Sequence, residues 1–154
     1  MSRRTAPNAV APESNELLRS RLLTWDLLLF EVGRRRRLER HQVMRLLQHV
    51  LELLAHDILR SLAEEEEGLY ARVEQDFPEL SPLVMELRAE HELIRRSIQE
   101  CIGKMGEEQD HDHDRWSISA LGGDLARNLR EHLRREEEEL IPAAVERWLE
   151  RCAS

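Results

Sequence analysis

The chain has 154 residues and a formal net charge of −8, with 41% hydrophobic, 35% charged and only 4% aromatic residues. This length suits one domain, and the composition is typical of amphipathic helices with solvated outer faces. The negative charge argues against a nucleic-acid partner, because binding to phosphates needs a positive field. The apolar runs are far shorter than the roughly 20 residues of a membrane span, and we find no hydrophobic signal segment. We therefore expect no membrane partner and a cytoplasmic location.

The first predicted helix follows a polar, proline-containing segment, residues 1–12, which we expect to be a disordered lead-in to a bundle over residues 13–152. Ser14 or Asn15 is the expected N-cap, and Gly33 is placed to end the helix after about Val32. The apolar residues of this helix recur at helical spacing on one side: Leu18, Leu22, Trp25, Leu29 and Val32. Asp26 lies at the edge of that stripe.

A second helix is predicted over about residues 36–75, and Ser61 and Glu65 share its apolar side. That side also carries a regular series of aliphatic residues: Leu47, Leu51, Leu54, Ile58, Leu62 and Leu69. The helix should end before a turn in which Ser81 is the N-cap and Pro82 the first residue of the next helix.

A third helix should run to about Lys104 and a fourth should begin near Arg115, after a polar loop. His91 falls among the inward-facing residues of the third helix: Leu83, Leu87, Ile94 and Ile98. His132 and Glu136 fall among those of the fourth: Leu121, Leu125, Leu129, Leu133 and Leu140. Pro142 should kink or end that helix and leave a short C-terminal helix. The pattern predicts an all-α fold, a bundle of four helices.

The second pair of helices repeats the pattern of the first. Ser61 and Glu65 stand where the later copy has His132 and Glu136, and Asp26 stands where it has His91. A His and a Glu four residues apart project from one side of a helix, so both side chains can bind the same cation. The comparison indicates a bundle with approximate internal symmetry, in which one half of a metal-type site lacks its histidines.

Each predicted helix thus places polar or ionisable groups on its apolar side. Burying an unpaired charge costs several kcal/mol, so such groups pair with one another or bind an ion. Imidazole and carboxylate together suit iron, manganese or zinc. The competing interpretation is a hydrogen-bonded polar layer without metal. His49 and His56 fall on another side of their helix, and His111 and His113 lie in the polar loop, so we expect these four histidines to be solvated.

Three segments carry a resemblance to a known family. LRAEHELI, HLRREEEELIP and SLAEEEEGLYA resemble the third-, fourth- and second-helix motifs of hemerythrin-like, HHE cation-binding domains. In that family a four-helix bundle holds a non-haem di-iron centre, so the resemblance implies an up-down-up-down topology for this chain. The resemblance implies that His91, His132, Glu136 and a bridging Glu65 are retained as metal ligands. The two missing histidines, at Asp26 and Ser61, belong to one half-site, which predicts a site reduced to one metal with Asp26 as an added ligand.

The leading prediction for function is a small metal-binding protein that holds one or two iron ions, with manganese or zinc as alternatives. By resemblance it senses O2 or NO, or handles iron. The alternatives are an iron-dependent oxidoreductase and a metal-free four-helix interaction module. The sequence identifies no protein partner.

Overall fold

The regular elements of the chain are all helices in the part that the structure, a computed structural model, describes: residues 12–35, 37–106 and 112–154. In chain order they are α1 (Pro12–Arg34), α2 (Arg37–Glu65), the π-helix η1 (Glu66–Tyr70), α3 (Ala71–Asp76), the 3-10 helix η2 (Pro78–Leu80), α4 (Ser81–Gly106), α5 (Asp112–Arg135), the π-helix η3 (Glu136–Leu140) and α6 (Ile141–Ala153). The predicted all-α class is confirmed.

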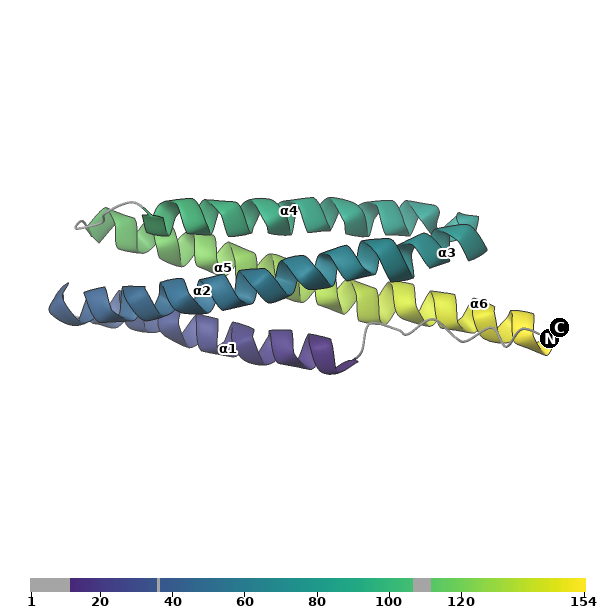
Figure 1. Ribbon diagram of the computed structural model, residues 1–154, viewed down its shortest axis with the longest axis horizontal. Coiled ribbons are helices and arrows are strands. Elements are labelled where there is room, and N and C mark those ends of the chain that lie inside the picture. Colours follow the sequence, from purple (N-terminus) through teal and green to yellow (C-terminus); the bar gives the residue numbers. More distant parts are fainter. Residues whose placement is uncertain (1–11, 36, 107–111) are drawn as a thin grey trace.

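The nine elements form four helical rods that run up and down the bundle (Figure 1). The rods are α1, then α2 with η1 and α3, then α4, and finally α5 with η3 and α6. α1 packs against α2 and α5, and α4 packs against α5 and α2. This is the predicted four-helix bundle. Among the described helices, none has both the length and the apolar character needed to cross a membrane.

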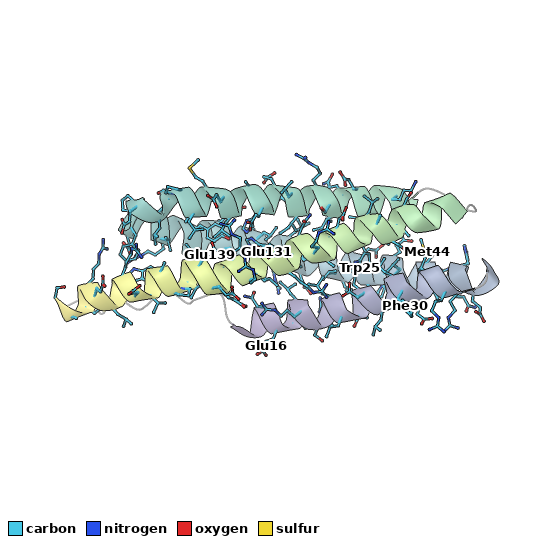
Figure 2. The ribbon with its side chains drawn as sticks, turned by 180° about the vertical axis from the view of Figure 1, so that it is seen from behind. Glu16, Trp25, Phe30, Met44, Glu131 and Glu139 are labelled. Carbon is cyan, nitrogen blue, oxygen red and sulfur yellow. The ribbon has the colours of Figure 1, made fainter. Side chains whose placement is uncertain are left out.

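Two apolar clusters fill the bundle, one towards each end. The larger contains the predicted stripes of the first two helices, except Leu69, and, from α4 and α5, Ile94, Ile98, Leu125, Leu129 and Leu133. Trp25 lies in this cluster (Figure 2), where its indole Nε1 donates a 3.0 Å hydrogen bond to the Gly122 carbonyl of α5. The smaller cluster includes Tyr70, Val73, Phe77, Leu87, Leu140 and Ala144. Residues between these two sets, along the three rods that contribute to both, are therefore enclosed on both sides.

The start of α1 differs from the prediction. Ser14 and Asn15 lie inside the helix, which begins at Pro12. The Asn15 side-chain amide instead donates a 3.1 Å hydrogen bond to Oε1 of Glu137, which lies in η3. Gly33 lies in the last turn of α1 and has no left-handed φ angle. The expected disordered lead-in falls, apart from Pro12, on residues outside the described part of the chain.

Pro142 was expected to kink or end the last long helix, yet the rod continues through η3 into α6. A proline ring clashes with the carbonyl four residues earlier in an α-helix, and it cannot donate the hydrogen bond made there. That carbonyl belongs to Glu138, which lies within the wider turn of η3. The π-helical turn therefore accommodates the proline, and the predicted short C-terminal helix is the direct continuation, α6.

Candidate metal site

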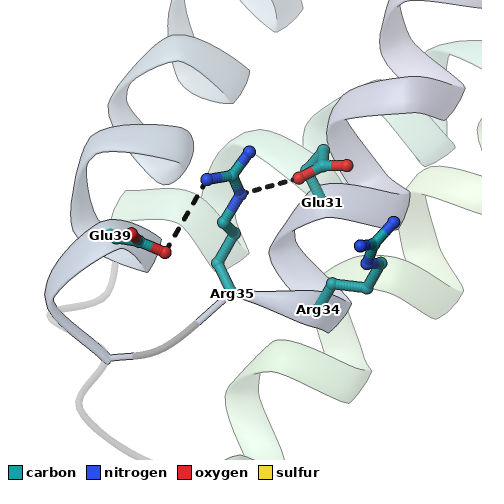
Figure 3. A pocket seen from close by; sticks show the side chains of 4 residues that line it. All are labelled: Glu31, Arg34, Arg35 and Glu39. Atoms are coloured by element: carbon teal, nitrogen blue, oxygen red, sulfur yellow. Dashed lines mark hydrogen bonds and ion pairs between the residues drawn. The ribbon is translucent and has the colours of Figure 1, made fainter.

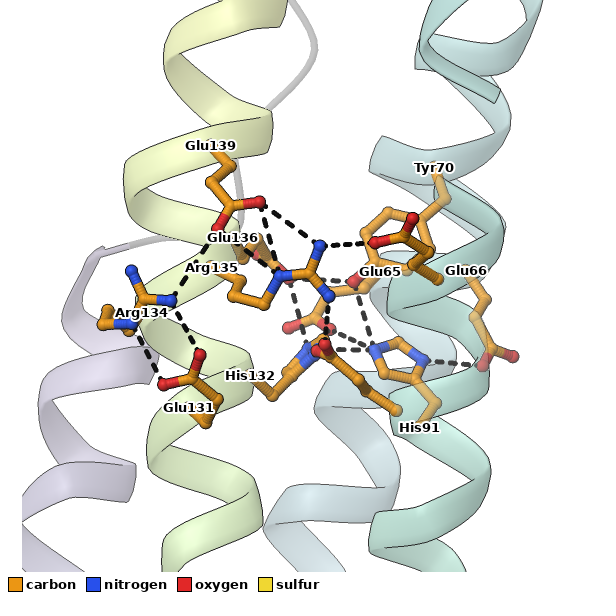
Figure 4. A network of polar contacts seen from close by, with 12 residues as sticks. Glu65, Glu66, Tyr70, His91, Glu131, His132, Arg134, Arg135, Glu136 and Glu139 are labelled. Atoms are coloured by element: carbon orange, nitrogen blue, oxygen red, sulfur yellow. Dashed lines mark hydrogen bonds and ion pairs between the residues drawn. The ribbon is translucent and has the colours of Figure 1, made fainter. Parts of the chain in front are cut away.

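Four buried polar side chains meet between the two apolar clusters (Figure 4), and we call them the polar layer: Glu65, His91, His132 and Glu136. Glu65 ends α2, His91 lies in the middle of α4, and His132 and Glu136 flank the junction of α5 with η3. Each is at most 1% exposed. Donor atoms of Glu65, His91 and His132 all lie within 4.8 Å of one another. The four residues predicted from the apolar stripes are thus brought together.

The spacing of these donor atoms matches that of ligands around one ion. Adjacent ligands about 2.1 Å from a metal lie roughly 3.0–3.4 Å apart in octahedral or tetrahedral shells. The Nε2 atoms of His91 and His132 are 3.0 Å apart. Oε2 of Glu65 lies 3.1 Å from the first and 3.5 Å from the second of these nitrogens. Oε2 of Glu136 is also 3.5 Å from Nε2 of His132. The residues present therefore fit a single cation.

A carboxylate contacts the Nδ1 atom of each imidazole, on the side of the ring away from the layer, and orients the ring. Nδ1 of His91 lies 2.7 Å from Oε1 of Glu66, and Nδ1 of His132 lies 3.0 Å from Oε2 of Glu90. Each carboxylate accepts a hydrogen bond from the Nδ1–H group, which leaves the Nε2 lone pair of a neutral imidazole facing the layer. Arginines hold the outer carboxylates in turn: Arg95 pairs with Glu66 at 3.0 Å, and Arg135 pairs with Glu90.

The layer favours positive charge at its centre. Burial opposes protonation of His132, but its hydrogen bonds to Glu136, Glu65 and Glu90 outweigh this and raise its pKa to about 11. Burial likewise favours the neutral acid at Glu65, but the bonds from His132 and His91 lower its pKa to about 2. Without a metal, a proton on His132 therefore balances the carboxylates, and a cation can replace it.

Glu136 shows what the metal-free layer lacks. Its Oε1 atom is buried and has no hydrogen-bond partner, and burial raises the pKa of this carboxyl. A buried polar atom left unpaired costs roughly 1–3 kcal/mol, and a bound cation would remove that cost.

Tyr70 joins the layer, although the sequence analysis assigned it no role. Its hydroxyl donates to Oε2 of Glu136 at 3.1 Å and lies 3.2 Å from Nε2 of His91. At α-helical pitch, a residue five positions after Glu65 points about 140° away from it. η1 closes its turns between residues i and i+5, which brings Tyr70 round to the side of Glu65. The only signal in the sequence was a single tyrosine within the second-helix motif.

The two positions that lack histidines do not rebuild a second half-site. Ser61 is buried, and its hydroxyl donates a 3.1 Å hydrogen bond to Oε1 of Glu65. Asp26, predicted as an added ligand, is not brought into the polar layer: its carboxylate is 41% exposed and pairs with Nη2 of Arg130 at 2.6 Å. The sequence analysis located Asp26 at the edge of the apolar stripe of α1. The ion pair with Arg130 holds its carboxylate on the solvent side of that edge.

His49, His56 and the pocket at the α1–α2 turn add no ligand to this site. His49 and His56 are exposed, as predicted, whereas His111 and the side chain of His113 lie outside the described part of the chain. A pocket of about 420 Å³ is lined by Glu31, Arg34, Arg35 and Glu39 (Figure 3). Arg35 pairs with Glu31 at 2.7 Å and with Glu39 at 3.7 Å, so these charges already compensate one another.

A family model, the hemerythrin HHE cation binding domain, matches residues 21–144. The chain belongs to this hemerythrin family. The match covers the whole polar layer and parts of all four rods. No curated protein and no solved structure matches the chain. Cation binding is the property that the family description names, and the hemerythrin-like bundle holds a candidate Glu-His-His site for it.

Proposed function

We propose that this hemerythrin-like chain binds a single iron ion through His91, His132, Glu65 and Glu136. The observation that carries the proposal is the convergence of two Nε2 atoms and Oε2 of Glu65, at 3.0, 3.1 and 3.5 Å from one another. Two imidazoles with carboxylates form a ligand set of the kind used by non-haem iron, and manganese and zinc accept the same donors. Membership of the cation-binding hemerythrin family supports a bound cation, and we propose iron ahead of manganese and zinc.

The state of the Glu65 carboxylate supports one ion rather than two. A bridging carboxylate uses one oxygen for each metal. Oε2 of Glu65 faces the two histidines, but Oε1 already accepts a 3.1 Å hydrogen bond from the Ser61 hydroxyl. Asp26 is held by Arg130 and supplies no donor on that side. The first half of the bundle therefore offers a second ion little beyond one shared oxygen.

The residues of the layer would bind the ion, fix the two rings and exclude water. Bound iron would supply a centre able to change oxidation state or to take up a small ligand. We place the chain in iron handling or in sensing of O2 or NO. Sensing requires a free position on the iron, which can be tested by adding NO to the Fe(II)-loaded protein and recording its electron paramagnetic resonance spectrum. A new iron-nitrosyl signal supports sensing, and its absence leaves iron handling.

The binding proposal is tested by thermal unfolding with Fe(II), with manganese or zinc, and with a chelator. A ligand that binds only the folded state at 100 times its Kd adds about 2.7 kcal/mol of stability. We expect Fe(II) to raise the Tm of the wild type and of His56→Ala, whose exposed imidazole lies elsewhere on α2. His132→Ala should show no shift. An unchanged wild-type Tm with every metal would contradict the proposal and favour the metal-free interaction module.

A further inference from the structure

The Tyr70 hydroxyl closes a ring of donor atoms in the polar layer (Figure 4). Going round, Oη of Tyr70 lies 3.1 Å from Oε2 of Glu136, which lies 3.5 Å from Nε2 of His132. That nitrogen is 3.0 Å from Nε2 of His91, which is 3.2 Å from the tyrosine oxygen. Three of these edges, 3.0–3.2 Å, fall within the spacing of neighbouring ligands around one ion, and the fourth, 3.5 Å, lies just above it. Oε2 of Glu65 caps the two histidine members of the ring.

The Tyr70 hydroxyl contacts two atoms that would themselves be metal ligands. Tyr70 is completely buried, and the polar neighbours of its oxygen are Glu136 and His91. An ion bound to Nε2 of His91 uses the lone pair of that nitrogen, so no hydrogen bond remains between the nitrogen and the phenol oxygen. The phenol oxygen would then lie beside a cation with its own lone pairs available. Ligation satisfies this buried oxygen, whereas a neutral phenol would keep only its bond to Glu136.

The backbone gives an independent reason to regard Tyr70 as part of the site. η1 begins directly after the ligand Glu65 and ends at Tyr70, and η3 begins at the ligand Glu136. Single π-helical turns within α-helices occur frequently at functional sites, because they redirect side chains at a cost in regular hydrogen bonding. Here the turn brings Tyr70 to the polar layer. The ring of Tyr70 also stacks on that of His91, with centroids 5.2 Å apart, which fixes its direction.

We propose that Tyr70 is a further ligand, whose phenolate oxygen binds the iron in its ferric state. The inference rests on the proposed single-iron site. On binding Fe(III), the phenol O–H bond breaks, an oxygen–iron bond forms, and the proton leaves to solvent water. The iron enters already ferric, as a soluble ferric chelate, so no oxidant is needed.

The charges around the layer support a trivalent ion. Glu65, Glu136 and the Tyr70 phenolate would supply three negative charges, which balance Fe(III). The outer carboxylates Glu66 and Glu90 are compensated by Arg95 and Arg135. A divalent ion would be balanced by the two carboxylates alone and would leave the phenol protonated, so the phenolate belongs to the ferric state. The site should therefore favour Fe(III) over Fe(II). Iron should remain bound when it is oxidised.

The experiment loads the wild type, Tyr70→Phe and His132→Ala with ferric citrate, removes excess iron, and records iron content, visible absorption and resonance Raman spectra. We expect the wild type to show a phenolate-to-iron charge-transfer band with tyrosinate vibrations. The chain contains one tyrosine, so these signals can only arise from Tyr70. Tyr70→Phe should lose the band and bind Fe(III) more than about tenfold more weakly, since even outer-shell losses cost that much. Its Fe(II) affinity should change far less.

The outcomes separate this inference from the proposal on which it rests. A wild type that binds one Fe(III), lost in His132→Ala, but shows no tyrosinate vibrations would overturn the role of Tyr70 and leave the iron site intact. A wild type that binds neither Fe(II) nor Fe(III) would overturn both. Should Tyr70→Phe fail to fold, the wild-type Raman spectrum still decides. Ga(III), which has no visible charge-transfer band, gives a second readout, because ligation should produce the ultraviolet difference spectrum of phenolate formation.

Discussion

Ser61 donates a 3.1 Å hydrogen bond to Oε1 of Glu65, while Oε2 of the same carboxylate lies 3.1 Å from Nε2 of His91. The two oxygens of Glu65 therefore serve different partners. The hydroxyl occupies the oxygen that a bridging carboxylate would give to a second ion. This relationship is the physical basis for assigning one ion to the layer.

Ser61→Ala should destabilise the metal-free protein without changing its metal stoichiometry. Removal of the hydroxyl leaves Oε1 of Glu65 buried and unpaired, which costs roughly 1–3 kcal/mol. Chemical denaturation of the metal-free variant measures the loss. Ser20→Ala is the matched control, because Ser20 is exposed on α1 and should tolerate the change. Equal stability of the two variants would show that the Ser61 bond contributes little.

Glu66→Ala should weaken metal binding although Glu66 is not a proposed ligand. Its carboxylate lies 2.7 Å from Nδ1 of His91 and orients that ring. Loss of such an outer partner commonly lowers metal affinity by about 10- to 100-fold. Competition with a chromogenic chelator measures the change. Glu67→Ala, at the exposed neighbouring position, should bind metal like the wild type; a similar loss in both variants would point to a general charge effect instead.

Gly122 and Gly123 should respond oppositely to alanine. A Cβ atom at Gly122 would lie 2.9 Å from side-chain atoms of Leu29 and Trp25, whereas one at Gly123 would meet nothing within 4 Å. Overpacking of a core contact costs roughly 1–3 kcal/mol. Alanine in place of an unhindered helical glycine instead contributes up to about 1 kcal/mol. Thermal unfolding should therefore rank Gly123→Ala at or above the wild type and Gly122→Ala below both. The reverse order would refute close packing of α1 on α5 at Gly122.

Asp76 should make the stability of the protein pH-dependent at the end of the bundle remote from the α1–α2 turn. The hydrogen bond from Trp148 Nε1, at 2.8 Å, and the ion pair with Arg72 lower the pKa of Asp76 below its ordinary 3.8. A carboxyl with a lowered folded pKa stabilises the protein above its ordinary pKa, and this contribution is lost as the pH falls through the folded value.

Asp76→Ala should accordingly lower the free energy of unfolding at neutral pH by on the order of 1 kcal/mol. The difference from the wild type should shrink as the pH falls below 3.8, the ordinary pKa of the group. Denaturation of both proteins over a pH series measures it. A deficit that stays constant down to the lowest pH would show that the contribution does not depend on the charge of Asp76.

Helical periodicity was sufficient to predict the bundle and most of the polar layer. Glu65, His91 and His132 lie on apolar stripes of α-helix, and Glu136 directly follows the last α-helical residue of α5, so a helical wheel places all four correctly. Tyr70 could not be placed in this way, because η1 changes the angle between successive residues.

The position of Asp26 could not be read from the sequence for a different reason. It lies at the edge of its stripe, where either orientation keeps the apolar residues of α1 buried. The 2.6 Å ion pair with Arg130, a residue of α5, decides the orientation. Such a contact depends on how two rods pack, which a single helix does not specify.

The central claim is one iron ion bound by His91, His132, Glu65 and Glu136. It is tested most directly by elemental analysis of iron per chain after anaerobic reconstitution with Fe(II) and desalting, with His132→Ala and Asp26→Ala in parallel. The account predicts about one iron in the wild type, none in His132→Ala and about one in Asp26→Ala, whose carboxylate pairs with Arg130. Two irons per wild-type chain, no iron at all, or loss of iron in Asp26→Ala would contradict it.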